Sequence, residues 1–285
     1  MLRRRACSAL ALTLASSRIG RAATPSRLRI GLTAVILADQ AAFLARWADY
    51  LSRRLDASVS FVSRDQYQAI HDLLGAGQID AAWTCGYPYV RSQPQLELLA
   101  VPLYRNRPVY QAYLIRAAGR REVRQWLDLA GKVVAYSDPL SNSGWLVAQG
   151  QLAAAGLSPR DLKRTFFAHG HRNVAEAVAS RLAHAGSIDG YVWETMRLQG
   201  MSAALNTEVV WRSADYGFPP LVAPANSGHS HTGALRQALI AMPNDEAGRA
   251  LLKALNLDGF TAGYPAMFDS IRQLARSVPG SGVDT

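Results

Sequence analysis

Cysteine is scarce in this sequence: only Cys7 and Cys85 occur in 285 residues, so a disulfide framework is excluded. No charge-free apolar run of about 18 residues follows Leu14, which argues against a membrane span in the rest of the chain. No heptad or Gly-X-Y period runs through the sequence, which excludes a coiled coil and collagen. With 49% hydrophobic and 18% charged residues, the composition is that of one or two globular domains.

The short motifs that mark common enzyme classes are also missing. The sequence has no nucleophile-elbow serine (G-x-S-x-G), no zinc-protease H-E-x-x-H, no phosphate-binding P-loop, no dinucleotide-binding G-x-G-x-x-G and no C-x-x-C. Their absence does not exclude catalysis, but no residue pattern in the sequence indicates it. We therefore expect a protein that is not an enzyme and has no cofactor.

The N-terminus has the three-part pattern of an export signal. Arginines at positions 3–5 precede the apolar run 6–14, and Gly20 and Ala22 place small residues at the two positions that a signal peptidase reads. We predict a signal peptide over residues 1–23 and a periplasmic location, with an amphipathic helix or an organellar presequence as alternatives. Cleavage would remove five arginines and no acidic residue, which halves the net charge of +10. The remaining charge is dispersed, so nucleic acid is not an expected partner.

From Leu28 onward, short apolar runs alternate with helical patterns. This alternation predicts an α/β protein with mainly parallel sheets. Strands are predicted at 28–33, 59–62, 80–84, 96–103, 109–116, 133–136, 165–168, 188–192, 209–212 and 221–223, and helices at 41–55, 66–76, 143–155, 173–182, 193–199, 234–241, 246–255 and 265–275.

The element order predicts two α/β lobes. Lobe 1 is expected to comprise residues 24–111 and 214–276, and lobe 2 residues 112–213. Two strands, near 110–116 and 209–213, would join them, an arrangement that allows hinge closure over a ligand. The Pro/Gly/Ser-rich tail at 277–285 is expected to be disordered.

The most informative polar stretch follows a predicted strand and opens a helix. Ser141, Asn142 and Ser143 supply short polar side chains there, beside the unpaired N–H groups and the positive dipole end of the helix. Such a corner can bind a tetrahedral oxyanion. The same residue types also form ordinary helix caps, so this segment alone leaves both interpretations open.

Histidines supply a second candidate. His171 lies at another predicted strand-to-helix junction, where an imidazole N–H can donate to an anion. A surface histidine near a cap and a metal ligand are the alternatives. His229 and His231 repeat the H-x-H form, but no acidic or cysteine partner stands at a diagnostic spacing.

Aromatic residues form a third group. Trp83 ends a predicted strand before a turn predicted at 86–88, so its side chain is a candidate for the cleft, with core packing as the alternative. Glu194 follows a strand end, where ligand sites of α/β proteins open. A first-turn glutamate favoured by the helix dipole is the alternative for that position.

Taken in order, these segments resemble the periplasmic substrate-binding proteins of phosphate, phosphite and phosphonate ABC transporters, the PhnD-like family. The resemblance implies a two-lobed, type II periplasmic-binding-protein fold that holds its ligand between the lobes and works as a monomer with an inner-membrane ABC permease. The matching pieces are Leu28–Leu32, Tyr67–Ile70, Gly77–Trp83, Pro108–Tyr110, Ser141–Gly144, Gly170-His171, Ile188-Asp189 and Trp211–Ser213.

Site residues follow from the resemblance by position. The family usually has threonine where this chain has Asn142, which supplies an amide in place of a hydroxyl. The carboxylates that hold an amine in some members correspond to Met196 and Pro219, so only the nearby Glu194 is available for that role. The implied oxyanion contacts are Ser141, Asn142, Ser143 and His171, with hydroxyl groups from Tyr67 and Tyr110 near Trp83.

We therefore expect an exported binding protein that captures a small phosphorus oxyanion in an interlobe cleft and delivers it to an ABC importer. Three other classes stay open at this stage. They are a ligand sensor for a membrane kinase, a hydrolase that uses Ser141 or Ser143 with His171, and a histidine-based metal-binding protein.

Overall fold

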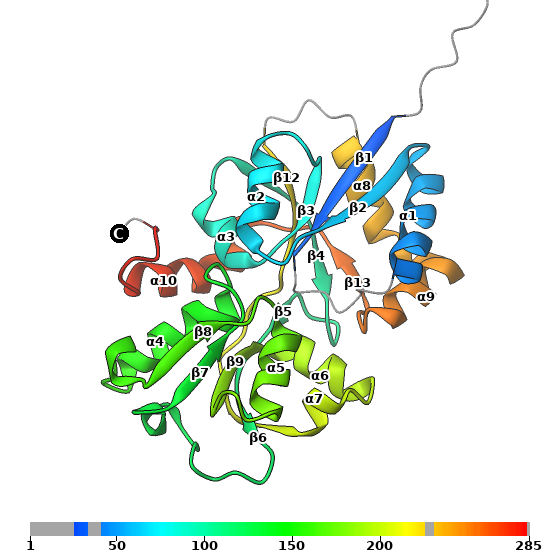
Figure 1. Cartoon of the computed structure of the whole chain (residues 1–285). Coiled ribbons are helices and arrows are strands. Elements are labelled where there is room, and N and C mark those ends of the chain that lie inside the picture. The colour runs from blue at the N-terminus through cyan, green and yellow to red at the C-terminus, as the bar shows by residue number, and fades with distance from the viewer. Residues whose placement is uncertain (1–25, 34–40, 226–230, 284–285) are drawn as a thin grey trace, which may run out of the picture.

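Two β-sheets organise the chain, each covered by helices (Figure 1). The structure is a computed structural model that describes residues 26–33, 41–225 and 231–283. The predicted signal peptide and His229 lie outside the described residues. Within the described ranges, none of the helices is long and apolar enough to cross a membrane.

The first sheet, with its helices, is called lobe 1 from here on. Its strand order is β13-β4-β12-β3-β1-β2. β1 pairs in parallel with β2 and β3, whereas β12 runs antiparallel to both β3 and β4. The strands are β1 (Arg27–Leu32), β2 (Ser58–Ser63), β3 (Ala81–Trp83), β4 (Leu96–Leu103), β12 (Leu221–Pro224) and β13 (Gly259–Thr261), and the helices α1 (Ala41–Leu55), α2 (Tyr67–Gly75), α3 (Gly86–Arg91), α8 (His231–Ile240), α9 (Glu246–Ala254) and α10 (Asp269–Ser277).

The second sheet, with its helices, forms lobe 2 and repeats the same plan. Its order is β10-β6-β9-β7-β8, with β7 parallel to β8 and β9, and β6 antiparallel to β9 and β10. Each sheet therefore contains a reversed strand, as in type II periplasmic binding proteins: β12, together with the edge strand β13, in lobe 1 and β6 in lobe 2. The strands are β6 (Ala112–Ala117), β7 (Val133–Tyr136), β8 (Arg164–Phe167), β9 (Ala185–Asp189) and β10 (Thr207–Arg212), and the helices α4 (Val147–Ala154), α5 (His171–Ala179), α6 (Gly190–Leu198) and α7 (Ser202–Leu205).

A short ladder of β5 (Val109–Tyr110) and β11 (Tyr216–Gly217) connects the lobes. The sequence placed the connecting strands near 110–116 and 209–213, which is wrong for most of those residues. They form β6 and β10, which pair inside the sheet of lobe 2. The chain leaves the ladder at Gln111, whose carbonyl accepts a hydrogen bond from the Gly190 N–H. Consecutive extended residues thus belong to two different sheets, which hydrophobic periodicity does not reveal.

Two local expectations differ from the structure. Residues 86–88 begin helix α3 and do not form an isolated turn. The tail expected to be disordered packs as far as residue 283: Ser281 is buried, its Oγ donates to the Ala275 carbonyl, and its own carbonyl accepts from the Tyr87 hydroxyl. Glycine at positions 280 and 282 adopts positive φ, so the Gly-rich composition serves a tight, packed turn.

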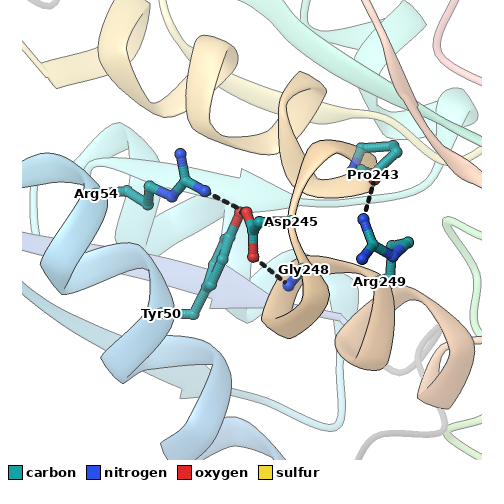
Figure 2. Close-up of polar contacts among 6 residues, drawn as sticks. All are labelled: Tyr50, Arg54, Pro243, Asp245, Gly248 and Arg249. Carbon is teal, nitrogen blue, oxygen red and sulfur yellow. Dashed lines mark hydrogen bonds and ion pairs between the residues drawn. The ribbon is translucent and has the colours of Figure 1, made fainter.

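Asp245 joins α1 to α9 in lobe 1 (Figure 2). Its side chain caps α9 by accepting from the Gly248 N–H at 2.8 Å, and it accepts from the Tyr50 hydroxyl at 2.9 Å and from Arg54. These bonds lower the pKa of Asp245, the Gly248 N–H contributing most. One carboxylate therefore supplies both a helix cap and a cross-helix link.

We expect Asp245→Ala to lower the free energy of unfolding by about 1–2 kcal/mol, because it removes the cap and the Tyr50 bond together. Urea unfolding at neutral pH measures this loss. Because the folded pKa of Asp245 is lowered, the stabilisation is present above the ordinary carboxyl pKa of about 4 and disappears as pH falls below it. Glu246→Ala, an exposed neighbour in the same helical turn, is the control and should change stability by only a few tenths of a kcal/mol. An equal loss in both variants would contradict the cap.

Candidate functional site

Four segments meet where the two lobes face each other. They are the start of α2 at Tyr67, the connecting strand β5 at Tyr110, the loop after β7, and the start of α5 at His171. Tyr67, Asn142 and His171 each have 0% of their surface exposed, although all three carry polar side chains. The cluster is therefore closed off from solvent.

The loop after β7 turns into a helix at Ser141. Ser141 is the N-cap: its Oγ accepts from the Gly144 N–H at 2.9 Å, and a π-helical turn at Asn142–Leu146 leads into α4. The ordinary helix cap, which the sequence offered as an alternative interpretation of this segment, is thus present at Ser141. Its hydroxyl hydrogen remains a potential donor, because the cap uses only its acceptor.

Asn142 and Ser143 carry polar atoms that the protein leaves unpaired. The Asn142 Nδ2 donates to the Tyr110 hydroxyl at 2.9 Å, while Asn142 Oδ1 and Ser143 Oγ have no hydrogen-bonding partner among the described residues. Burial raises the pKa of the Tyr110 phenol well above its ordinary value, and the nearby Asn142 and Ser143 side chains oppose part of that shift. Ser137 Oγ, at the start of the same loop, is a third buried polar atom without a partner. Buried polar groups are nearly always paired, so the gathering of three such atoms in one loop makes that loop the candidate ligand site.

His171 is a neutral donor. Its Nδ1 accepts from the Asp189 backbone N–H at 3.1 Å, which places the ring proton on Nε2. Burial lowers the pKa of His171 to about 3, so the imidazole stays uncharged at neutral pH. Nε2 lies 3.4 Å from the Tyr67 hydroxyl, beyond the usual hydrogen-bond range, so the His171 N–H and the Tyr67 O–H stand side by side and both can turn to a ligand. The preceding Gly170 has φ 146°, a conformation that favours glycine.

Two buried carboxylates border the cluster. Asp138 accepts from the N–H groups of Tyr67 (3.1 Å) and Leu140 (2.8 Å), and Asp189 caps α6 by accepting from the Val192 N–H at 3.2 Å. Burial raises the pKa of both, that of Asp189 to about 7. Sequence reasoning did not select either residue. Asp138 precedes Ser141 in the polar loop and Asp189 lies in a piece that matches the family, so the sequence offered a reason to select each of them.

Trp83 does not reach the cluster. Its indole N–H donates to the Pro219 carbonyl at 2.9 Å, and its ring packs edge-on against Trp47 and Phe260 in the core of lobe 1. The pleat of β3 sends this side chain to the face of the sheet on which Trp47 of α1 packs, and a single sequence does not tell which face that is.

Glu194 also lies elsewhere. It accepts from the Tyr113 hydroxyl at 3.1 Å and stands 3.8 Å from Arg105, and it lines an open surface cavity of about 830 Å³ with Arg249 and Lys253. Asp189 occupies the strand end at which Glu194 was expected, and Glu194 follows five residues later on α6.

In the part of the chain that the structure describes, the cluster shows neither a serine–histidine hydrogen bond nor a three-ligand metal group. His171 lies beside Tyr67 and bonds a backbone N–H, not Ser141 or Ser143, and a neutral imidazole protonated on Nε2 is no base for a serine nucleophile. Among the described residues, no group of three His, Cys, Asp or Glu side chains could hold a metal ion.

Comparison with known proteins gives a consistent result. A family model described as the periplasmic substrate-binding protein of a phosphonate ABC transporter matches residues 31–268. The phosphate-import protein PhnD of Mycolicibacterium smegmatis is 29% identical over 176 residues. That alignment covers 57% of this chain and 55% of the relative, so the match spans about half of the relative's length.

Two solved structures have the same fold. The binding-protein component of a phosphonate ABC transporter from Pseudomonas aeruginosa aligns with a TM-score of 0.81 at 20% identity, over 90% of this chain and 88% of that one. PhnD1 from Prochlorococcus marinus in complex with methylphosphonate aligns with a TM-score of 0.77 at 18% identity, over 89% and 98%. At these identities the likeness establishes the two-lobed architecture.

Proposed function

The chain belongs to the family of periplasmic substrate-binding proteins of phosphonate ABC transporters, and from this premise we propose that it captures phosphate, phosphite or a small phosphonate in the buried cluster. Membership of a periplasmic family also implies that the protein is exported. The signal peptide at 1–23, action as a monomer and docking on an inner-membrane permease are further parts of this proposal.

The unpaired atoms of the loop carry the proposal. Leaving a buried hydroxyl or amide oxygen without a partner costs about 1–3 kcal/mol, and Ser137, Asn142 and Ser143 each hold such an atom. An anion with several acceptor oxygens pairs with the hydroxyl groups. Turning the Asn142 amide over keeps its bond to Tyr110, because a phenol donates as well as accepts, and presents the NH₂ group to the ligand.

Neutral donors suit a carrier that must release its cargo. Ser143, Tyr67 and His171 offer polarised hydrogens from both lobes, and the N-terminal end of the helix beginning at Asn142 adds a positive dipole. Because none of these three donors carries a fixed positive charge, opening the lobes returns a hydrated anion to water without breaking an ion pair to them.

Calorimetry with phosphate, phosphite, methylphosphonate and sulfate tests the proposal. We expect a phosphorus oxyanion to bind, and Ser143→Ala and His171→Ala each to weaken it about tenfold or more, the effect of losing one donor to a charged ligand. Ser180→Ala is the matched control, since Ser180 lies at the far end of α5. Absence of binding by every anion, or equal affinities for all variants, would refute the proposal.

A further inference from the structure

Asp138 of lobe 2 caps a helix that belongs to lobe 1. Its Oδ2 accepts from the N–H of Tyr67, the first residue of α2, at 3.1 Å, and its Oδ1 accepts from the Leu140 N–H in its own loop at 2.8 Å. The residue before α2, Gln66, makes no side-chain cap. The start of α2 therefore receives its carboxylate from the opposite lobe.

The same loop makes a second contact across the lobes. The Asn142 N–H donates to Cys85 Sγ at 3.3 Å, and Cys85 precedes α3 of lobe 1 without capping it by a side chain. Asp138 is 2% exposed and Cys85 is fully buried. Separating the lobes would leave a carboxylate without its cross-lobe donor and the N-terminus of α2 without its cap, so these contacts favour the closed arrangement.

We propose that Asp138 is a positioning residue that holds the two lobes closed by capping α2 across the cleft, without touching the ligand; this rests on the proposed function for the identity of the ligand only. The Leu140 bond fixes the loop between Asp138 and the ligand donors at Ser141–Ser143. Closure and correct placement of those donors therefore occur together. Asp138 consequently governs how fast the ligand leaves, and not how fast it arrives.

The negative charge of Asp138 acts on anion affinity in the opposite direction from its role as a cap. A negative charge near an anion site weakens binding, so removal of Asp138 for its charge alone would tighten it. Removal of a cap that holds the lobes together loosens it. The two roles predict opposite changes in affinity, which makes the proposal testable.

The first test measures the kinetics of methylphosphonate and phosphate release by stopped flow. We expect Asp138→Asn to raise the dissociation rate constant about tenfold, since an amide has one acceptor for two N–H donors, and to change the association rate constant less than twofold. Asp138→Glu keeps the charge but not the reach, and should also release faster. Unchanged or slower release in Asp138→Asn, or wild-type release in Asp138→Glu, would overturn the proposal.

The second test needs no ligand. It therefore distinguishes failure of the cross-lobe cap by Asp138 from failure of the proposed function. Cys85 is buried between the lobes, and burial raises the pKa of its thiol to about 11, so the closed form resists alkylation. Iodoacetamide labelling of the Cys85 peptide, read by mass spectrometry, should be several-fold faster in Asp138→Asn and Asp138→Glu. Asp161→Asn, which removes an exposed cap that bonds Ser158 within lobe 2, is the control and should label like the wild type. Equal labelling rates in all four proteins would refute the claim that Asp138 holds the lobes closed.

Discussion

Replacing Asn142 with aspartate is expected to abolish tight anion binding while leaving the fold intact. The two side chains have the same shape, and the Tyr110 hydroxyl can donate to the new carboxylate as readily as it accepts from the amide. A buried negative charge about 5 Å from a bound anion costs about 3 kcal/mol at an effective dielectric constant near 20, which is a loss of about 100-fold or more. Calorimetric titration with phosphate and methylphosphonate at pH 8 measures it.

A neutral substitution at the same position is the control for this loss. Asn142→Thr introduces the residue that the family usually has there, and its hydroxyl still donates, so we expect affinity within about tenfold of the wild type. The aspartate variant should also regain binding as pH falls, because burial raises the pKa of a carboxyl group, as it does for the buried Asp189, and the protonated form carries no charge. Binding by Asn142→Asp as tight as by Asn142→Thr at pH 8 would place the ligand elsewhere.

Local sequence patterns predicted most of the architecture because each element hides one face. Helix α1 illustrates this: Phe43, Trp47 and Leu51 recur at helical spacing and are among the residues that the structure buries. The type II fold class came from the family resemblance, and no strand order was predicted, since single-sequence periodicity does not specify which strands are neighbours.

The candidate site was predictable only in part. The structure brings Tyr67, Tyr110, Ser141–Ser143 and His171 together, in line with the ordered family pieces. Whether they bind the ligand stays a prediction. Asp138 escaped selection because its partner Tyr67 is 71 residues away, and its role exists only when the lobes meet. A capping carboxylate within one helix and one across a cleft look identical in a sequence.

Gly144→Ala is expected to destabilise the protein and to remove anion binding at the same time. A Cβ placed on Gly144 would lie 1.8 Å from Ser137 Oγ, 2.7 Å from Ser137 Cβ and 2.9 Å from Ser141 Oγ. Ser137 has little freedom to move away, since its N–H donates to the Gly144 carbonyl and its own carbonyl accepts from Gly170. We expect a loss of about 2–4 kcal/mol in the free energy of unfolding, the upper range for overpacking.

Urea unfolding and calorimetry on the same preparation measure both effects. Gly75→Ala at the exposed end of α2 is the control, because its Cβ would meet no atom within 4 Å; it should be neutral or stabilise by up to about 1 kcal/mol.

Adding Ser137→Gly to Gly144→Ala removes two of the three colliding atoms and should recover much of the lost stability. Because displacement of the loop also moves the donors at Ser141 and Ser143, affinity in the single variant should fall about 100-fold, and the double variant should recover part of it. Gly144→Ala with wild-type stability and affinity would mean that the loop adapts freely, and the rigid placement of its donors would then be wrong.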